Sequence, residues 1–113
     1  MSGRNASKNK GDAAEREVAT LLADLLGLPV RRKLGAGRAD DEGDLEGVPD
    51  WTLEVKNYAS LADGINEGLA DLEREQANAG TTFGACLVRR RGGRWIAVMD
   101  LNGLATVVRE TLA

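Results

Sequence analysis

The stretch GDLEGVPDWTLEVKN, residues 43–57, decides the fold of this chain. Residues 51–57 alternate apolar and polar side chains, which is the pattern of a β-strand with one face against a core. The segment GVPD before them is rich in turn-forming residues, so we expect residues 44–46 to be the preceding strand of a hairpin. The turn sets the strand pairing, which we expect to be Glu46 with Trp51, Leu45 with Thr52, and Asp44 with Leu53.

Two aspartates in this stretch compete as the partner of Glu54 at a metal ion. Strand residues rise about 3.3 Å each, so Asp50 and Glu54 on one straight strand would lie roughly 13 Å apart. Mg²⁺ holds its ligands at about 2.0–2.1 Å, which two such distant carboxylates cannot share. Asp44 lies on the neighbouring strand, diagonal to Glu54 and within reach. We therefore expect Asp44 to be the working acid, with Asp40 and Asp41 as lesser candidates.

Lys56 gives this acidic pair a possible chemistry. Glu54 and Lys56 point to the same face of their strand, because side chains repeat every two residues. Carboxylates holding a divalent cation beside an ammonium group suit phosphodiester hydrolysis, in which the cation lowers the pKa of a bound water and the lysine positions that water. The competing interpretation is a solvated strand face with a Glu–Lys pair, since this tripeptide pattern is common. Asp44, ten residues before Glu54, adds weight to the catalytic interpretation.

Composition limits the chemistry that the chain can perform. Its 113 residues, 42% of them hydrophobic, suffice for one small domain with a core that needs no disulfides. The chain has one cysteine, Cys86, and no histidine. This excludes nucleophile systems built on histidine and disfavours a zinc site. The polar N-terminus and the lack of a run long enough to span a membrane lead us to expect a soluble, cytoplasmic protein.

The net charge of −3 hides a separation of charges along the chain. Residues 40–54 include acids and no base, whereas residues 89–94 include four arginines and no acid. Residues 31–33 form another basic group. Local patches set the field that a ligand meets, so the weakly acidic total does not exclude a polyanionic partner. The arginines of residues 89–94 are interpreted either as a solvated hairpin tip or as DNA contacts.

Periodicity predicts the remaining elements in the order αβββαββα. Residues 1–10 form a flexible basic tail before a single domain over residues 11–113. Asp12 and Glu15 occupy the positions of a capping box at the start of the first helix. Beyond the hairpin we expect helices over residues 12–26, 61–78 and 103–113 and strands over residues 28–33, 81–91 and 94–101. Ser60 caps the second helix, Gly64 and Gly68 let it approach another backbone closely, and Cys86 lies in the core.

These segments together resemble the PD-(D/E)xK nuclease superfamily, and within it the archaeal-type Holliday junction resolvases. KGDAAEREVATLL (residues 10–22) is similar to that family's opening motif, and LPVRR (residues 28–32) to its first strand. GDLEG and WTLEVK are similar to its metal-binding aspartate strand and its Glu-x-Lys strand. The resemblance implies an α/β fold with a restriction-endonuclease-like core, in which helices flank a central mixed sheet of about five strands. It also implies a Mg²⁺-dependent endonuclease, with Mn²⁺ as a substitute, that resolves four-way DNA junctions in recombination and repair.

The resemblance further implies roles for individual residues. The catalytic residues would be Glu15, Asp44, Glu54 and Lys56, and the metal ligands Glu15, Asp44, Glu54 and the backbone carbonyl of Val55. The DNA-binding residues would be Lys10, Arg16, Arg31, Arg32, Lys33 and Arg38, with the choice between Arg31 and Arg32 as the backbone contact left open. Members of the family work as homodimers, so we expect DNA and a second copy as partners, and no membrane.

Several alternatives stay open. Glu15 could serve only as a helix cap, and Gln76 could be a polar helix-end residue or a group near the lysine. The chain could also be a nuclease of the same fold that acts on duplex ends or single strands. A module that binds nucleic acid without cutting it is the alternative from another functional class.

Overall fold

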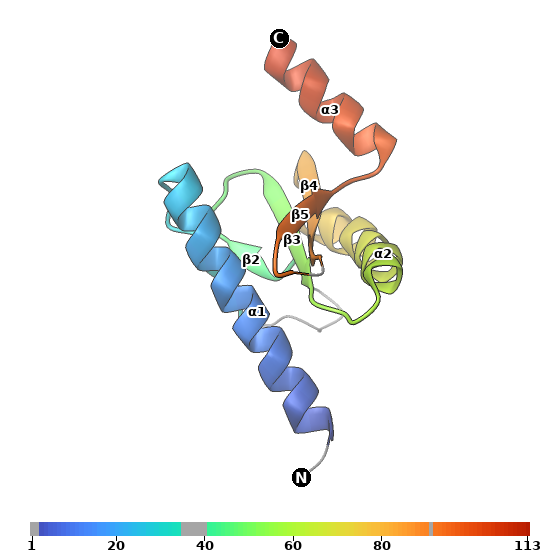
Figure 1. The fold of residues 1–113 in the computed structure, drawn as a ribbon. Helices are drawn as coiled ribbons and strands as arrows, with labels where there is room; N and C mark the ends of the chain where they lie inside the picture. Colours follow the sequence, from blue (N-terminus) through green and yellow to red (C-terminus); the bar gives the residue numbers. More distant parts are fainter. Residues whose placement is uncertain (1–2, 35–40, 91) are drawn as a thin grey trace.

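The computed structural model describes residues 3–34, 41–90 and 92–113, and of residues 3–10 it describes the backbone alone. Its elements are α1 (Gly3–Leu26), β1 (Arg31–Arg32), β2 (Leu45–Glu46), β3 (Trp51–Lys56), α2 (Leu61–Ala79), β4 (Phe83–Arg89), β5 (Trp95–Val98) and α3 (Leu101–Leu112). The predicted order of helices and strands is confirmed. The chain is an α/β protein with a five-stranded mixed sheet and three helices (Figure 1).

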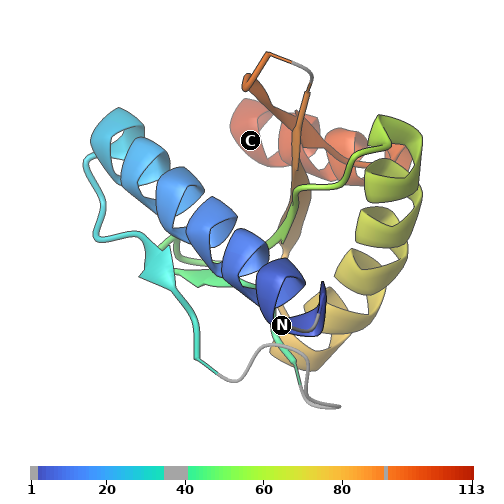
Figure 2. The same ribbon diagram turned by 60° about the horizontal axis from the view of Figure 1, so that its bottom comes forward.

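The sheet has the strand order β1-β2-β3-β4-β5. Only β3 and β4 pair in parallel, and the other neighbours are antiparallel. A parallel pair needs a crossover, which α2 provides. The helices α1 and α2 lie on opposite sides of the sheet (Figure 2). Because β3 and β4 run the same way, their carboxyl ends meet at one edge, where ligands bind in open α/β sheets.

Two different kinds of packing hold the helices on the sheet. The main core lies between α1 and the sheet and includes Val18, Leu53 and Leu87. On the other face, α2 approaches closely because it presents glycines: a Cβ on Gly68 would collide with Sγ of the fully buried Cys86. The core position of Cys86 is therefore confirmed. The glycines do bring α2 close to the sheet, but their nearest neighbours are side-chain atoms and not the backbone that we expected.

The first helix begins earlier than expected. The predicted start at residue 12 was wrong, because α1 is helical from Gly3 and includes most of the stretch that we expected to be a flexible tail. Asp12 and Glu15 thus lie inside the helix and form no capping box. They bind the guanidinium group of Arg32 instead, at 2.8 Å and 3.0 Å. A helix already held by packing extends at little further cost, because propagation is easier than nucleation.

The hairpin register also differs from the prediction by one residue. Leu45 pairs with Leu53 rather than with Thr52. The backbone N–H of Asp44 also donates to the carbonyl of Leu53, at 2.9 Å. Two residues of one strand thus face one residue of the other, which is the arrangement of a β-bulge. Turn composition fixed the approximate pairing, but it carried no signal for the extra residue.

The ends of the other strands and of the last helix differ from the predicted ranges. The strand expected over residues 28–33 is reduced to β1, because its only neighbour, β2, is itself two residues long. Strands β4 and β5 are shorter than predicted at both ends. The last helix starts at Leu101, before the expected residue 103, because Asp100 caps it by accepting from the N–H of Gly103 at 2.8 Å.

Candidate active site

Asp44 is held rigidly beside β3. Its side chain is 6% exposed, and Oδ2 accepts a hydrogen bond from the backbone N–H of Val55 at 2.8 Å. Bulges redirect side chains next to active sites, and here the Asp44 carboxylate lines the same hollow as Glu54 and acts on it electrostatically. Asp50 lies at the far end of β3, exposed, and accepts from the N–H of Thr82 at 2.8 Å. The geometry therefore places Asp44, and not Asp50, next to Glu54.

Glu54 and Glu75 form a buried pair of carboxyl groups. Glu54 is 3% exposed and Glu75, from α2, is 2% exposed. Burial raises the pKa of Glu54 above the usual glutamate value, and hydrogen bonds with Asp44 and Glu75 raise it further. Burial also raises the pKa of Glu75. Adjacent buried carboxyl groups favour their protonated forms, because like charges repel and burial penalises the ionised form.

One oxygen of Glu75 has no partner. Arg74 lies 3.6 Å from Oε1, but Oε2 is the one buried side-chain oxygen or nitrogen without a hydrogen bond in the part of the chain that the structure describes. Leaving a buried polar group unsatisfied costs roughly 1–3 kcal/mol. Such an atom in a native structure calls for a reason, such as a catalytic role or a bound ion.

Lys56 faces the same region from the end of β3. Its Nζ donates to Oδ2 of Asp71, on α2, at 2.7 Å, and it lies 5.6 Å from the ring centroid of Tyr58. Burial lowers the pKa of Lys56, but the hydrogen bond to Asp71 and the charge of Glu54 outweigh burial, so that the pKa lies above the usual lysine value. The ammonium group is therefore charged at neutral pH and fixed in direction.

Glu15 reaches the site from α1. Its carboxylate accepts from Nε of Arg32 at 3.0 Å. Burial raises the pKa of Glu15, and the nearby charge of Asp44 raises it further. Glu15 thus faces the carboxylates across the end of the sheet, and it does so without capping its helix.

These groups line one hollow of about 610 Å³ at the sheet edge. Its ionisable lining residues include Glu15, Asp41, Asp44, Glu54, Lys56, Asp71 and Glu75. Over residues 3–34, 41–90 and 92–113, no three acidic or cysteine side chains are arranged as a group that could hold a metal ion. The carboxyl groups of Asp44, Glu54 and Glu75 nevertheless line the same hollow and act on one another electrostatically.

The predicted DNA-binding residues lie in different surroundings. Arg31 has a side chain that is 75% exposed and pairs with Glu46 at 3.0 Å. Arg32 is closer to the carboxylates, but its charge is balanced by Asp12 and Glu15. Of the other four candidates, Lys33 lies 3.5 Å from Glu42 and Arg16 is exposed. Arg38 and the Lys10 side chain lie outside the described residues, as does Asp40.

Sequence reasoning missed the contribution of α2 to the site. Asp71 contacts Lys56 and Glu75 contacts Glu54. Gly64, Gly68, Asp71 and Glu75 follow one another at spacings of four, three and four residues, which places them on one helix face. The glycine spacing could therefore have identified the two acids as facing the sheet. Asp41, a lesser candidate, also lines the hollow, and its Oδ1 accepts from the N–H of Gly43 at 2.8 Å.

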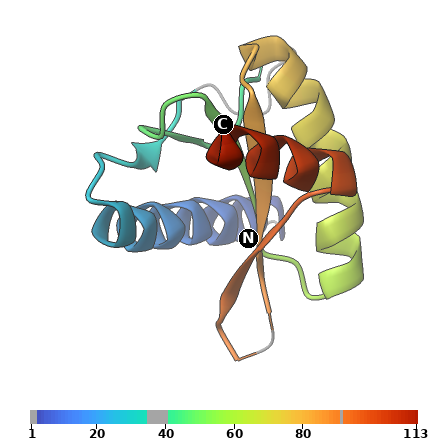
Figure 3. The ribbon, with the colours of Figure 1, turned by 90° about the horizontal axis from the view of Figure 1, so that it is seen from above.

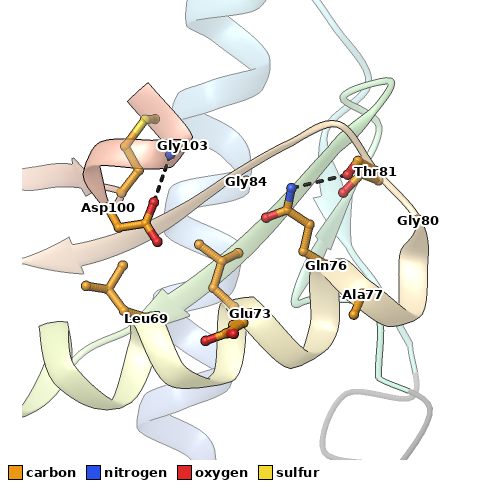
Figure 4. A pocket seen from close by; sticks show the side chains of 11 residues that line it. Leu69, Glu73, Gln76, Ala77, Gly80, Thr81, Gly84, Asp100 and Gly103 are labelled. Carbon is orange, nitrogen blue, oxygen red and sulfur yellow. Dashed lines mark hydrogen bonds between the residues drawn. The ribbon is translucent and has the colours of Figure 1, made fainter. Parts of the chain in front are cut away.

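Gln76 lies in a separate hollow of about 470 Å³ between α2, β4 and the start of α3 (Figure 4). Its amide donates to the carbonyl of Thr81 at 3.2 Å, so Gln76 has a helix-end role and is not a neighbour of the lysine. Asp100, on the same hollow, caps α3. These polar groups are used in turns and caps, so the carboxylate hollow is the stronger candidate for a functional site.

Comparison of the chain with protein-family models, with curated proteins and with solved structures gave no match. Among the described residues, no helix combines the length and the apolar character that crossing a membrane requires. The case for a function therefore rests on the geometry of the site itself.

Proposed function

We propose that this chain is a Mg²⁺-dependent DNA endonuclease with a restriction-endonuclease-like core, and specifically a Holliday junction resolvase that acts as a homodimer. The observation that carries the proposal is the meeting of three buried carboxyl groups, from Asp44, Glu54 and Glu75, with the ammonium group of Lys56 in one hollow. Buried charges without partners destabilise a fold. Groups with strongly shifted pKa values that gather in a cleft are candidates for a functional site.

The donors are of the kind that Mg²⁺ binds, namely carboxylate and water oxygens, and their side chains would have to turn toward a common centre to share one ion. Asp44 and Glu54 would be the first ligands, and Oε2 of Glu75 would gain the partner that it lacks. Glu15 and the carbonyl of Val55 line the same hollow and are further candidates. When bound, Mg²⁺ would neutralise phosphate charge and lower the pKa of the attacking water.

The other tasks fall to Lys56 and its neighbours. Because its raised pKa keeps Lys56 charged at neutral pH, it donates hydrogen bonds to a water or a phosphate oxygen and does not accept a proton. Asp71 fixes the direction of the ammonium group. A lysine held in this way positions the nucleophile, and such positioning is a large part of catalysis.

The proposal is tested with a labelled four-way junction, a duplex of the same sequence and a single strand, each incubated with protein in Ca²⁺ and then in Mg²⁺. We expect binding in both ions and cleavage in Mg²⁺, with the junction preferred. Asp44→Asn should abolish cleavage but keep binding, since losing a negative charge does not weaken attraction to phosphates. Asp50→Asn is the matched control, because Asp50 is exposed and far from Glu54, and it should cut at the normal rate.

The results separate the possible functions. Binding without cleavage in either ion would mean a non-catalytic nucleic-acid-binding module. Preferential cutting of duplex ends or of the single strand would support the nuclease proposal and contradict the resolvase proposal. Normal cleavage by Asp44→Asn would show that the carboxylate hollow is not the active site.

A further inference from the structure

A second hollow lies directly beside the carboxylate hollow. It also has a volume of about 610 Å³, and its lining includes Asn57, Tyr58, Leu61, Arg89 and Arg90. The two hollows share Asn57, Tyr58 and the following alanine. They therefore form one continuous path along the edge of the sheet, from the carboxylates to the hairpin that joins β4 and β5.

The parallel pairing of β3 and β4 explains why these segments meet. Lys56 pairs with Val88, so Asn57, the first residue after β3, lies near Arg89, the last residue of β4. The hairpin then turns back, with the N–H of Arg90 donating to the carbonyl of Arg94 at 2.8 Å. Figure 3 shows this hairpin projecting from the body of the molecule.

The second hollow has the opposite charge to the first. No acidic residue lines it within the described part of the chain. Arg89 is 3.9 Å from Glu17, at the outer limit of an ion pair, and packs over Trp95. Arg90 is exposed and makes no ion pair with any described residue. The carboxylate hollow repels a polyanion, so binding of a nucleic acid there needs a source of positive charge close by.

Tyr58 lies between the two charged regions. It belongs to the loop shared by both hollows and is 36% exposed. Exposed aromatic rings within basic grooves are platforms on which bases stack, and the positive groups of such grooves follow the phosphate backbone. An acidic site, an aromatic ring and two arginines thus lie in sequence along one path.

We propose that this second hollow binds the phosphate next to the one being cut, with Arg89 and Arg90 as its ligands and Tyr58 against the intervening nucleotide. This inference rests on the proposed nuclease function, because it concerns the strand that enters the same site. It assigns Arg89 and Arg90 to substrate positioning, whereas the sequence alone slightly favoured a solvated hairpin tip.

The test measures the binding of a fluorescent four-way junction by anisotropy in EDTA, where no cleavage occurs, over a range of salt concentrations. Arg90→Gln should weaken binding several-fold and make the log–log salt slope shallower by about 0.9, the value for one lost phosphate contact. Arg90→Lys should restore the slope, because it restores the charge. The matched control is Arg109→Gln, an exposed arginine on α3, which should change neither quantity.

A second measurement locates the contact. A junction with one uncharged methylphosphonate beside the cut should bind wild type more weakly than the unmodified junction does. Arg90→Gln should bind the modified and the unmodified junction equally well. The proposal would be overturned if Arg90→Gln left the salt slope unchanged, or if Arg90→Gln and Arg109→Gln weakened binding equally. It would also be overturned if the losses of affinity from Arg90→Gln and from the methylphosphonate simply added. If wild type still binds and cuts DNA in any of these cases, the proposed nuclease function stands and only the second hollow is rejected. If wild type binds no DNA, both proposals are rejected.

Discussion

At the scale of single residues, Glu75 shows most clearly that the site is kept at a cost to stability. Its carboxyl group is almost fully buried beside Glu54, and one oxygen has no partner among the described residues. Raised pKa values mean that the folded state holds these protons more tightly than the unfolded chain does. The stability that protonated Glu75 contributes is therefore fully present below pH 4.5, its pKa in the unfolded chain. That contribution is lost as the pH rises through its pKa in the folded protein.

Glu75→Gln should remove this loss for one group, because an amide resembles the protonated acid. In EDTA at pH 8 the variant should be more stable than wild type by roughly 1–3 kcal/mol, because the amide has no proton to lose and each unit by which the fold raises a carboxyl pKa costs about 1.4 kcal/mol at this pH. Near pH 4.5 the two proteins should differ little. Urea unfolding at several pH values measures this, with the exposed Glu73→Gln on the same helix as control. Parallel pH profiles for wild type and Glu75→Gln would contradict the burial argument.

At the scale of elements, α2 links the fold to the site. It forms the crossover between β3 and β4, covers one face of the sheet and contributes Asp71 and Glu75. Its close approach depends on Gly64 and Gly68, which leave room for Val88, Cys86 and the stem of Lys56. Helix propensity alone would favour alanine at both positions, so packing decides these residues.

Gly68→Ala should therefore destabilise the protein although it improves helix propensity. Overpacking of a tight core costs about 1–3 kcal/mol, and the added methyl group would meet Sγ of Cys86. Gly11→Ala on α1 is the matched control, because a Cβ there meets nothing within 4 Å and should stabilise by about 0.5–1 kcal/mol. Thermal unfolding of both variants checks the pair, and a stable Gly68→Ala variant would show that α2 does not need this approach.

At the scale of the whole molecule, the described part of each chain has one carboxylate hollow, at the edge of a five-stranded sheet. A four-way junction presents two like strands related by near two-fold symmetry. Paired cuts therefore need two copies of the site, and a symmetric dimer with the same surface on both subunits would supply them at a fixed separation.

If the resolvase proposal holds, light scattering should report a dimer, and a supercoiled plasmid with a cruciform should become linear with little nicked product. Mixing wild type with an excess of Asp44→Asn should shift the product toward nicked circles, because mixed dimers keep one working site. A strict monomer, or a plasmid that is mainly nicked by wild type, would remove the paired mechanism while leaving a nuclease.

Local sequence patterns predicted much of the fold and part of the site. The order of helices and strands, the cap at Ser60 and the core position of Cys86 follow from periodicity and turn composition, which act over a few residues. The choice of Asp44 over Asp50 as the neighbour of Glu54 also needed only the rise of a strand and one turn. These features depend on neighbours in the sequence, so the sequence alone determined them.

Only the tertiary structure decided the rest. Three features depend on contacts between different segments of the chain. They are the bulge at Asp44, the positions of Asp71 and Glu75 on α2, and the proximity of Arg89 to the loop after Lys56. Turn composition cannot count an extra residue in a strand, and helical periodicity does not say which strand a helix covers. The sequence by itself determined the elements and the first carboxylate pair, and packing across the sheet determined which other groups surround that pair.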